Sequence, residues 1–149
     1  MRVSRMFFGT LLAIVLLGAV RSPASAGEMG IRVPVPGGAY TNVTAPALKR
    51  MLERKDFLFF NAHIPYEGEI ANTDAFLPFD KVEQQLHLLP PRKDTKIVLY
   101  CISDRMSTIA SETLVRLGYT NIWNLQGGMV GWRQQGFHPT IYLAGRGPR

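Results

Sequence analysis

The sequence predicts a three-layer α/β fold with a central parallel β-sheet and helices on both of its faces. Two observations lead to this prediction. Short apolar runs without alternating polar residues indicate strands that are covered on both faces. Helical patterns lie between these runs, and alternating strands and helices form right-handed crossovers in a parallel sheet. The 149 residues show no internal repeat and no sign of a second domain.

The composition suits one ordinary globular domain. Hydrophobic residues make up 46% of the chain, charged residues 19%, and there is one cysteine. These values exclude a disordered chain, a collagen-like chain and a disulfide-rich scaffold. The net charge of +6 is spread along the chain rather than gathered in a basic run, so we expect no nucleic-acid partner.

The N-terminus has the layout of a secretory signal peptide. Arg2 and Arg5 precede an uncharged run over residues 6–20, and Ala24 and Ala26 stand at the small-residue positions of a cleavage site. The run is shorter than the roughly 20 residues that a membrane-spanning helix needs, so membrane contact is expected only through an uncleaved leader. We expect cleavage after Ala26, which ends the signal peptide, and an extracytoplasmic destination such as a bacterial periplasm.

The mature chain is expected to begin with a lead-in and to end with a tail. Residues 27–38 are rich in glycine and proline and contain few apolar residues, so an extended lead-in is expected over residues 27–44. The folded domain is expected over residues 45–140, and residues 141–149 are expected to form a C-terminal tail.

A helix is predicted at the start of the domain. Thr44 can cap its N-terminus, and Pro46 lies in its first turn, where proline is tolerated. The apolar residues Leu48, Met51 and Leu52 follow at helical spacing.

Three buried strands are predicted after this helix. Residues 57–62 contain five apolar residues out of six without alternation, which is typical of a strand covered on both faces. Residues 96–100 and residues 121–125 show similar apolar runs.

A second helix is predicted between the first two strands. Asp80 and Glu83 form a capping-box pattern ahead of Val82, Leu86 and Leu89. Two consecutive prolines then end the pattern.

Two more helices are predicted in the C-terminal half. One carries an apolar stripe and ends at Gly118; its stripe consists of Met106, Ile109, Ala110, Thr113, Leu114 and Leu117. The other covers residues 129–135 and ends at Gly136. The pair Gly127 and Gly128 before it is interpreted as a turn, because no phosphate-binding glycine motif surrounds it.

Cys101 is the candidate catalytic residue. It follows the strand over residues 96–100, and ligands of parallel sheets bind at the carboxyl ends of strands. Amide N–H groups at the start of the next helix would stabilise an anion there, either a thiolate or a substrate oxyanion. Arg105 could favour the thiolate and pair with an incoming anion, and Ser103 offers a hydroxyl donor. A lone cysteine at a strand end is also consistent with a small buried apolar residue.

Sequence motifs around this cysteine resemble the C-terminal half of a rhodanese domain. They appear in the family's order: Lys96-Ile-Val-Leu-Tyr-Cys101, then Arg105-Met106-Ser107, then residues 112–122, and then Leu125-Gln-Gly-Gly-Met-Val-Gly-Trp132. The N-terminal half is a looser match. Asn61 and His63 stand where the family usually has Asp and Arg, and the resemblance spans residues 45–136.

The resemblance implies a rhodanese-like fold and sulfur transfer. Cys101 would take a sulfane sulfur from thiosulfate or a similar small anion, form a persulfide, and pass the sulfur to a thiophilic acceptor. The cradle around the substrate would consist of Ile102, Ser103, Asp104, Arg105 and Met106. From their places in the chain, His63 and Trp132 could lie at the rim of the cleft. No cofactor is expected, and the isolated histidines and single cysteine indicate no metal site.

The cysteine loop departs from the family pattern at two positions. Active loops often carry Arg directly after the cysteine and Gly at the third position after it, whereas this chain has Ile102 and Asp104. A carboxylate at position 104 would oppose thiolate formation unless it points outward or pairs with Arg105. The alternative function is therefore a non-catalytic rhodanese-like module that binds a partner protein or a small anion.

A cysteine phosphatase would use a similar loop. That family typically has His before the cysteine and Arg six positions after it. Here Tyr100 precedes Cys101 and Ser107 occupies the sixth position, so the pattern favours a sulfur-handling loop.

Overall fold

The computed structural model describes residues 30–139. The predicted signal peptide and the predicted C-terminal tail lie outside this range. The strands are β1 (Ile31–Val35), β2 (Gly38–Val43), β3 (Leu58–Asn61), β4 (Ala75–Phe76), β5 (Ile97–Tyr100) and β6 (Ile122–Leu125). The α-helices are α2 (Ala45–Leu52), α3 (Arg105–Arg116) and α4 (Gly128–Gln134). Within the described range, no helix is long and apolar enough to cross a membrane.

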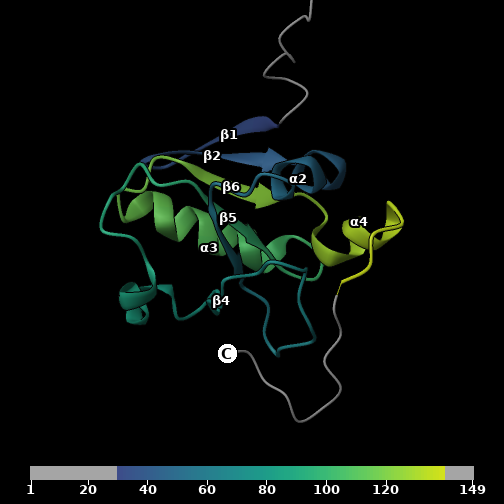
Figure 1. Cartoon of the computed structure of the whole chain (residues 1–149). Coiled ribbons are helices and arrows are strands. Elements are labelled where there is room, and N and C mark those ends of the chain that lie inside the picture. The colour runs from purple at the N-terminus through teal and green to yellow at the C-terminus, as the bar shows by residue number, and fades with distance from the viewer. Residues whose placement is uncertain (1–29, 140–149) are drawn as a thin grey trace, which may run out of the picture.

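All six strands form one sheet in the order β1-β2-β6-β5-β3-β4 (Figure 1). Strands β2, β6, β5, β3 and β4 pair in parallel, and among the described strands only the edge strand β1 pairs antiparallel, with β2. The three predicted strands are the centre of this sheet, which confirms the predicted α/β fold with a largely parallel sheet.

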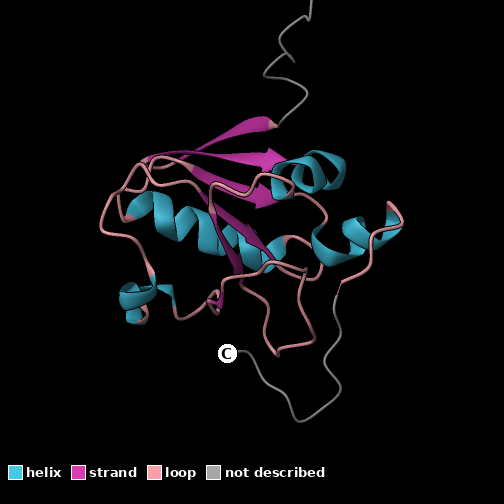
Figure 2. Cartoon of the chain, viewed as in Figure 1, coloured by secondary structure: helices cyan, strands magenta, loops and turns pink. Residues whose placement is uncertain are grey.

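Helices cover both faces of the sheet, as predicted (Figure 2). Helix α3 packs on one face, and α2 and α4 pack on the other. Alternate residues of the same strands point to opposite faces of the sheet and pack into the two layers. The α3 layer contains Phe60, Ile97 and Leu99. The layer of α2 and α4 contains the neighbouring residues Phe59, Val98 and Tyr100.

The segment predicted as an extended lead-in contains two strands that the sequence analysis missed. Strands β1 and β2 form a hairpin, and β2 joins β6, so this segment is part of the domain. Pro34 lies in the edge strand β1, which is where a sheet tolerates proline. The hairpin was hidden because proline and glycine interrupt its apolar residues, and of its two strands only Ala39, Tyr40 and Val43 are buried.

The predicted helix after Asp80 is wrong. The chain forms two short 3₁₀ turns, η1 (Val82–Gln84) and η2 (Leu86–Leu88), and no side chain caps either turn. Leu86 is 50% exposed, so the apolar spacing does not produce one buried stripe. Without such a stripe, packing does not stabilise a regular helix.

The other predicted helices are confirmed. Thr44 caps α2, and its Oγ1 accepts a hydrogen bond from the Ala47 N–H at 3.4 Å. The buried stripe of α3 is rotated relative to the prediction: Ser107, Ala110, Ser111, Thr113, Leu114 and Val115 are buried, whereas Ile109 is 38% exposed. This rotation turns two serines toward the sheet, and one of them contacts the candidate catalytic sulfur.

Candidate active site

Cys101 lies between the end of β5 and the start of α3, and it is 1% exposed. Its Sγ accepts a hydrogen bond from the Asp104 backbone N–H at 3.1 Å and one from the Ser107 hydroxyl at 3.4 Å. Both donors come from the first turn of α3 or the residue before it. They would stabilise negative charge on the sulfur.

Asp104 has an unusual backbone conformation that accompanies the contact with the sulfur. Its φ is 117° and its ψ is −41°, outside the region that residues other than glycine readily adopt. Such a conformation costs of order 1–3 kcal/mol. Glycine, which the family often has at this position, adopts such a φ more readily than aspartate.

The Asp104 carboxylate forms a hydrogen bond with the neighbouring strand. Its Oδ1 accepts from Asn124 Nδ2 at 2.6 Å, and the same amide nitrogen donates to Asn42 Oδ1 at 2.9 Å. The carboxylate therefore pairs with Asn124 on β6, not with Arg105. Neither asparagine was assigned a role from the sequence; the available signal for Asn124 was its place as a polar residue inside an apolar strand.

Ser107 is a site residue that the sequence analysis did not assign. It is completely buried, and its hydroxyl lies within hydrogen-bond distance of both Cys101 Sγ and the Asp104 carbonyl oxygen, at 3.4 Å and 3.0 Å. Ser103, the predicted hydroxyl donor, is exposed. The signal that could have identified Ser107 is its position in the first helical turn after the cysteine.

The remaining predicted cradle residues follow the cysteine in the chain. Ile102 and Met106 are half-buried, and Arg105 is exposed. Among residues 30–139, Arg105 forms no ion pair. Its guanidinium is therefore available to an anion that approaches the loop from solvent.

Helix α4 holds the cysteine loop from the side. The Met129 N–H donates to the Cys101 carbonyl oxygen and the Val130 N–H to the Ile102 carbonyl oxygen, both at 2.9 Å. A Cβ on Gly128 would lie 2.7 Å from the Ile102 oxygen and would also overlap the Cys101 oxygen. The predicted turn is confirmed, and the structure shows why it needs glycine: the start of α4 touches the loop backbone.

Tyr100 connects the strand before the cysteine to the loop after β3. Its hydroxyl accepts a hydrogen bond from the Ile70 N–H at 3.0 Å and lies 2.7 Å from Thr73 Oγ1. Burial raises the pKa of Tyr100 well above its usual value, so the hydroxyl stays protonated. This contact holds residues 70–73 in place beside the sheet.

His63 lies at the end of β3, where a rim position was predicted. Its backbone N–H donates to Asn61 Oδ1, and its Nε2 lies 3.8 Å from Glu67 Oε2, beyond hydrogen-bond distance. Burial lowers the pKa of His63, and the nearby Glu67 carboxylate opposes this effect. Within the described residues, these contacts of His63 stay in its own loop and do not reach the sulfur.

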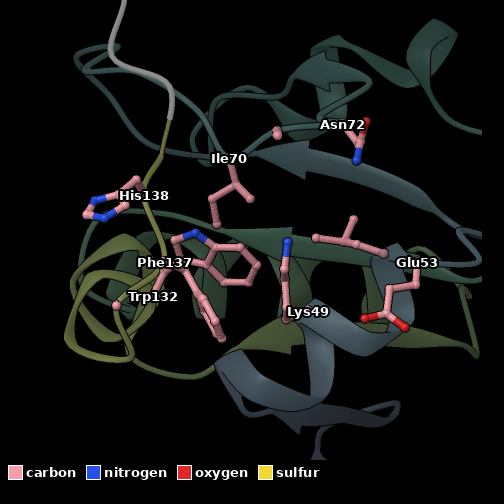
Figure 3. Close-up of a pocket in the computed structure, with 10 residues that line it drawn as sticks. Lys49, Glu53, Ile70, Asn72, Trp132, Phe137 and His138 are labelled. Carbon is pink, nitrogen blue, oxygen red and sulfur yellow. The ribbon is translucent and has the colours of Figure 1, made fainter.

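Trp132, the other predicted rim residue, lies in the layer of α2 and α4. It is 4% exposed, and its ring centroid is 4.8 Å from that of Phe137. It also lines a pocket between α2 and α4 (Figure 3). The structure therefore places Trp132 on the helix that supports the loop, and its contacts lie beside that pocket.

A comparison with known families agrees with this geometry. The family model for the rhodanese-like domain matches residues 44–135. The chain belongs to the rhodanese-like domain family. The resemblance stated from the cysteine-loop motifs is thereby confirmed, and the match includes the cysteine loop, α3, β6 and α4.

Relatives of the chain include a protein named as a sulfurtransferase and a tRNA-modifying hydroxylase. The chain is 32% identical over 93 residues to a sulfurtransferase from Allochromatium vinosum, which covers 59% of this chain and 82% of that protein. It is 29% identical over 102 residues to the tRNA uridine(34) hydroxylase of Escherichia coli, covering 62% of this chain but only 29% of that enzyme.

A solved rhodanese structure has the same fold. The thiosulfate sulfurtransferase from Pseudomonas aeruginosa superposes with a TM-score of 0.58 at 26% identity, covering 67% of this chain and 20% of that chain. Together with the family match, this places the chain among rhodanese-like proteins with sulfurtransferase relatives.

Proposed function

We propose that this protein is an exported sulfurtransferase that carries a sulfane sulfur as a persulfide on Cys101. The observation that carries the proposal is the pair of hydrogen-bond donors on Sγ, the Asp104 N–H and the Ser107 hydroxyl. They stabilise the thiolate before attack and again when the sulfur leaves.

The first half-reaction loads the sulfur. The Cys101 thiolate attacks the outer sulfur of thiosulfate, a new S–S bond forms, and the S–S bond of thiosulfate breaks. Sulfite leaves with the electron pair of that bond. Exposed Arg105 would attract the donor anion to the loop.

The second half-reaction unloads the sulfur. A thiophilic acceptor, such as cyanide or a thiolate, attacks the outer sulfur of the persulfide. The Cys101 thiolate leaves and is again stabilised by its two donors. Sulfur moves as a neutral atom between two nucleophiles, so the cycle needs no cofactor. Because the chain has one cysteine, no second thiol of the same chain can resolve the persulfide.

The test is an intact mass of the protein after incubation with thiosulfate. We expect a gain of one sulfur atom, loss of that gain after cyanide, and thiocyanate in solution. The single cysteine makes the mass change assignable to Cys101. The variant Cys101→Ser should show neither the mass change nor turnover.

Failure to gain sulfur from thiosulfate and also from an organic persulfide would overturn the proposal. That result would favour the alternative, a non-catalytic rhodanese-like module that binds a partner protein or a small anion. If the protein gains sulfur from the organic persulfide alone, the result supports Cys101 as a persulfide carrier and excludes thiosulfate as the donor.

Export is a separate part of the proposal and rests on the N-terminal sequence pattern. The expected product is a periplasmic protein whose N-terminus is Gly27. N-terminal sequencing of the protein from the periplasmic fraction of a bacterial host tests this. A protein that retains Met1 and remains with the membrane fraction would show that the leader acts as an anchor.

A further inference from the structure

A pocket of about 350 Å³ lies between α2, α4 and the loop after β3 (Figure 3). Its lining includes Lys49 of α2, Trp132 of α4, and Ile70, Asn72 and Phe137 from the connecting segments. The volume falls within the range of small-molecule sites. None of these residues belongs to the cysteine loop, so the pocket is separate from the proposed sulfur-transfer site.

The walls of this pocket are held in place by contacts of their own. The Ile70 N–H is bonded to the Tyr100 hydroxyl, and the Ile70 carbonyl accepts from the Thr73 N–H and hydroxyl. On the other side, Gly136 has a φ of 77° and reverses the chain, so that Phe137 packs on Trp132. Because its walls are already ordered, the pocket can bind a ligand without the entropic cost of ordering those walls.

Two residues that line the pocket carry hydrogen-bond donors with no partner among residues 30–139. The Trp132 Nε1 is buried and has no hydrogen-bond partner among the described residues. Lys49 is exposed and forms no ion pair within residues 30–139. In Figure 3 its ammonium points into the pocket toward Ile70 and Trp132, whereas the Glu53 carboxylate stays beside α2. A buried donor without an acceptor is unfavourable, and an acceptor on a ligand would relieve it.

We propose that this pocket binds a small organic anion with a flat apolar body and one carboxylate or similar acidic group. The Trp132 and Phe137 rings and the Ile70 side chain would contact the apolar body. The Lys49 ammonium on the α2 side would pair with the acidic group, and the Trp132 N–H is a second donor on the α4 side. This site goes beyond the proposed sulfur transfer and does not depend on it.

The test uses benzoate as the probe and the indole N–H signals of the ¹⁵N-labelled protein as the readout. The chain has two tryptophans, so two such signals are expected. The Trp123 N–H already donates to Asn121 Oδ1 at 2.8 Å. Benzoate should shift the Trp132 signal in a saturable way and leave the Trp123 signal in place. Trp123→Phe assigns the two signals even if Trp132→Phe does not fold.

Variants and ligand analogues test the charge contact. Lys49→Gln should weaken benzoate binding about fivefold, and neutral benzamide should bind the unaltered protein about fivefold more weakly than benzoate. The matched control is Lys81→Gln, an exposed lysine in the η1 region, which should bind benzoate like the unaltered protein.

A Trp132 signal that does not move at tens of millimolar benzoate would overturn the proposal. Equal affinity of Lys49→Gln and the unaltered protein would also overturn it, because the acidic group would then have no specific partner. Neither result bears on sulfur loading at Cys101, which is measured by mass.

Discussion

Asp104 combines a favourable backbone contact with an unfavourable side chain. Its N–H donates to Cys101 Sγ, yet its carboxylate adds negative charge close to a site proposed for anions. Asn124 reduces this conflict by binding the carboxylate on the β6 side. We infer that Asn124 is a positioning residue that acts through Asp104.

Asp104→Gly should raise thiosulfate turnover. Glycine adopts a φ of 117° without strain, and the variant removes the nearby negative charge. The N–H that contacts the sulfur remains. Steady-state thiocyanate formation measures the effect, and a rise of about tenfold is expected, equivalent to about 1.4 kcal/mol.

Asn124→Ala should change turnover in the opposite direction. It removes the amide that binds the Asp104 carboxylate. The carboxylate can then rotate toward the cysteine loop, where its negative charge would repel thiosulfate and lower turnover. The double variant with Asp104→Gly should recover most of the loss. A loss that persists in the double variant would show that Asn124 acts by another route, such as its bond to Asn42.

Ser107→Ala should lower sulfur loading by about tenfold, because it removes one of the two donors to Cys101 Sγ. The rate at which the intact mass increases with thiosulfate measures this effect. Thr108→Ala on the next position of α3 is the control and should load at the normal rate. An unchanged rate in Ser107→Ala would contradict a role for the hydroxyl at the sulfur.

Helix α4 supports the cysteine loop although it is only seven residues long. Its first turn donates two N–H groups to the carbonyl oxygens of the cysteine loop. This contact requires the backbones to approach more closely than a Cβ permits. Gly128 therefore links the packing of α4 to the geometry of the site.

Gly128→Ala should destabilise the fold and reduce sulfur loading together. The added Cβ would overlap the Ile102 and Cys101 oxygens, and φ at this position is 54°. We expect a loss of about 2–4 kcal/mol in the free energy of unfolding, measured with urea.

Gly118→Ala is the matched control for this glycine. Its φ is 88°, but apart from its chain neighbours no atom of residues 30–139 lies within 4 Å of the added Cβ. It should cost only about 1 kcal/mol and leave sulfur loading intact. Equal losses in the two variants would show that backbone conformation, rather than contact with the loop, explains the requirement for Gly128.

The stability of the whole domain should depend on the protonation of His63. Burial lowers the pKa of His63 from 6.5, so the unfolded chain binds this proton at a higher pH than the folded chain does. The free energy of unfolding should therefore fall as the pH drops below about 7, and stop falling from this cause below the folded-state pKa.

Urea unfolding of the protein and of His63→Gln between about pH 5 and pH 8 measures this contribution. The variant should lose less stability on acidification. His87→Gln, which alters an exposed histidine, should retain the pH dependence of the unaltered protein. A steeper acid loss in His63→Gln would reverse the inferred sign.

The predictions that held depend on patterns within one short segment. Continuous apolar runs identified the three central strands, and the motif around Cys101 identified the loop and the family. The capping pattern after Asp80 failed because a helix there also needs a surface to pack against, and Leu86 remains exposed. The first two strands were missed because pairing with β6, rather than their own composition, makes them part of the sheet.

The chemical environment of the sulfur depends instead on contacts between distant segments. Asn124 and Asn42 are 82 positions apart, and their bond belongs to the network that binds the Asp104 carboxylate. Ser107 reaches the sulfur because α3 is rotated relative to the stripe that spacing alone predicts. The local sequence was thus sufficient for the position of the cysteine loop, the parallel sheet and the family. The donors around the Cys101 sulfur and the α2–α4 pocket required the packed structure, because hydrogen bonding and close packing act between residues that the chain order separates.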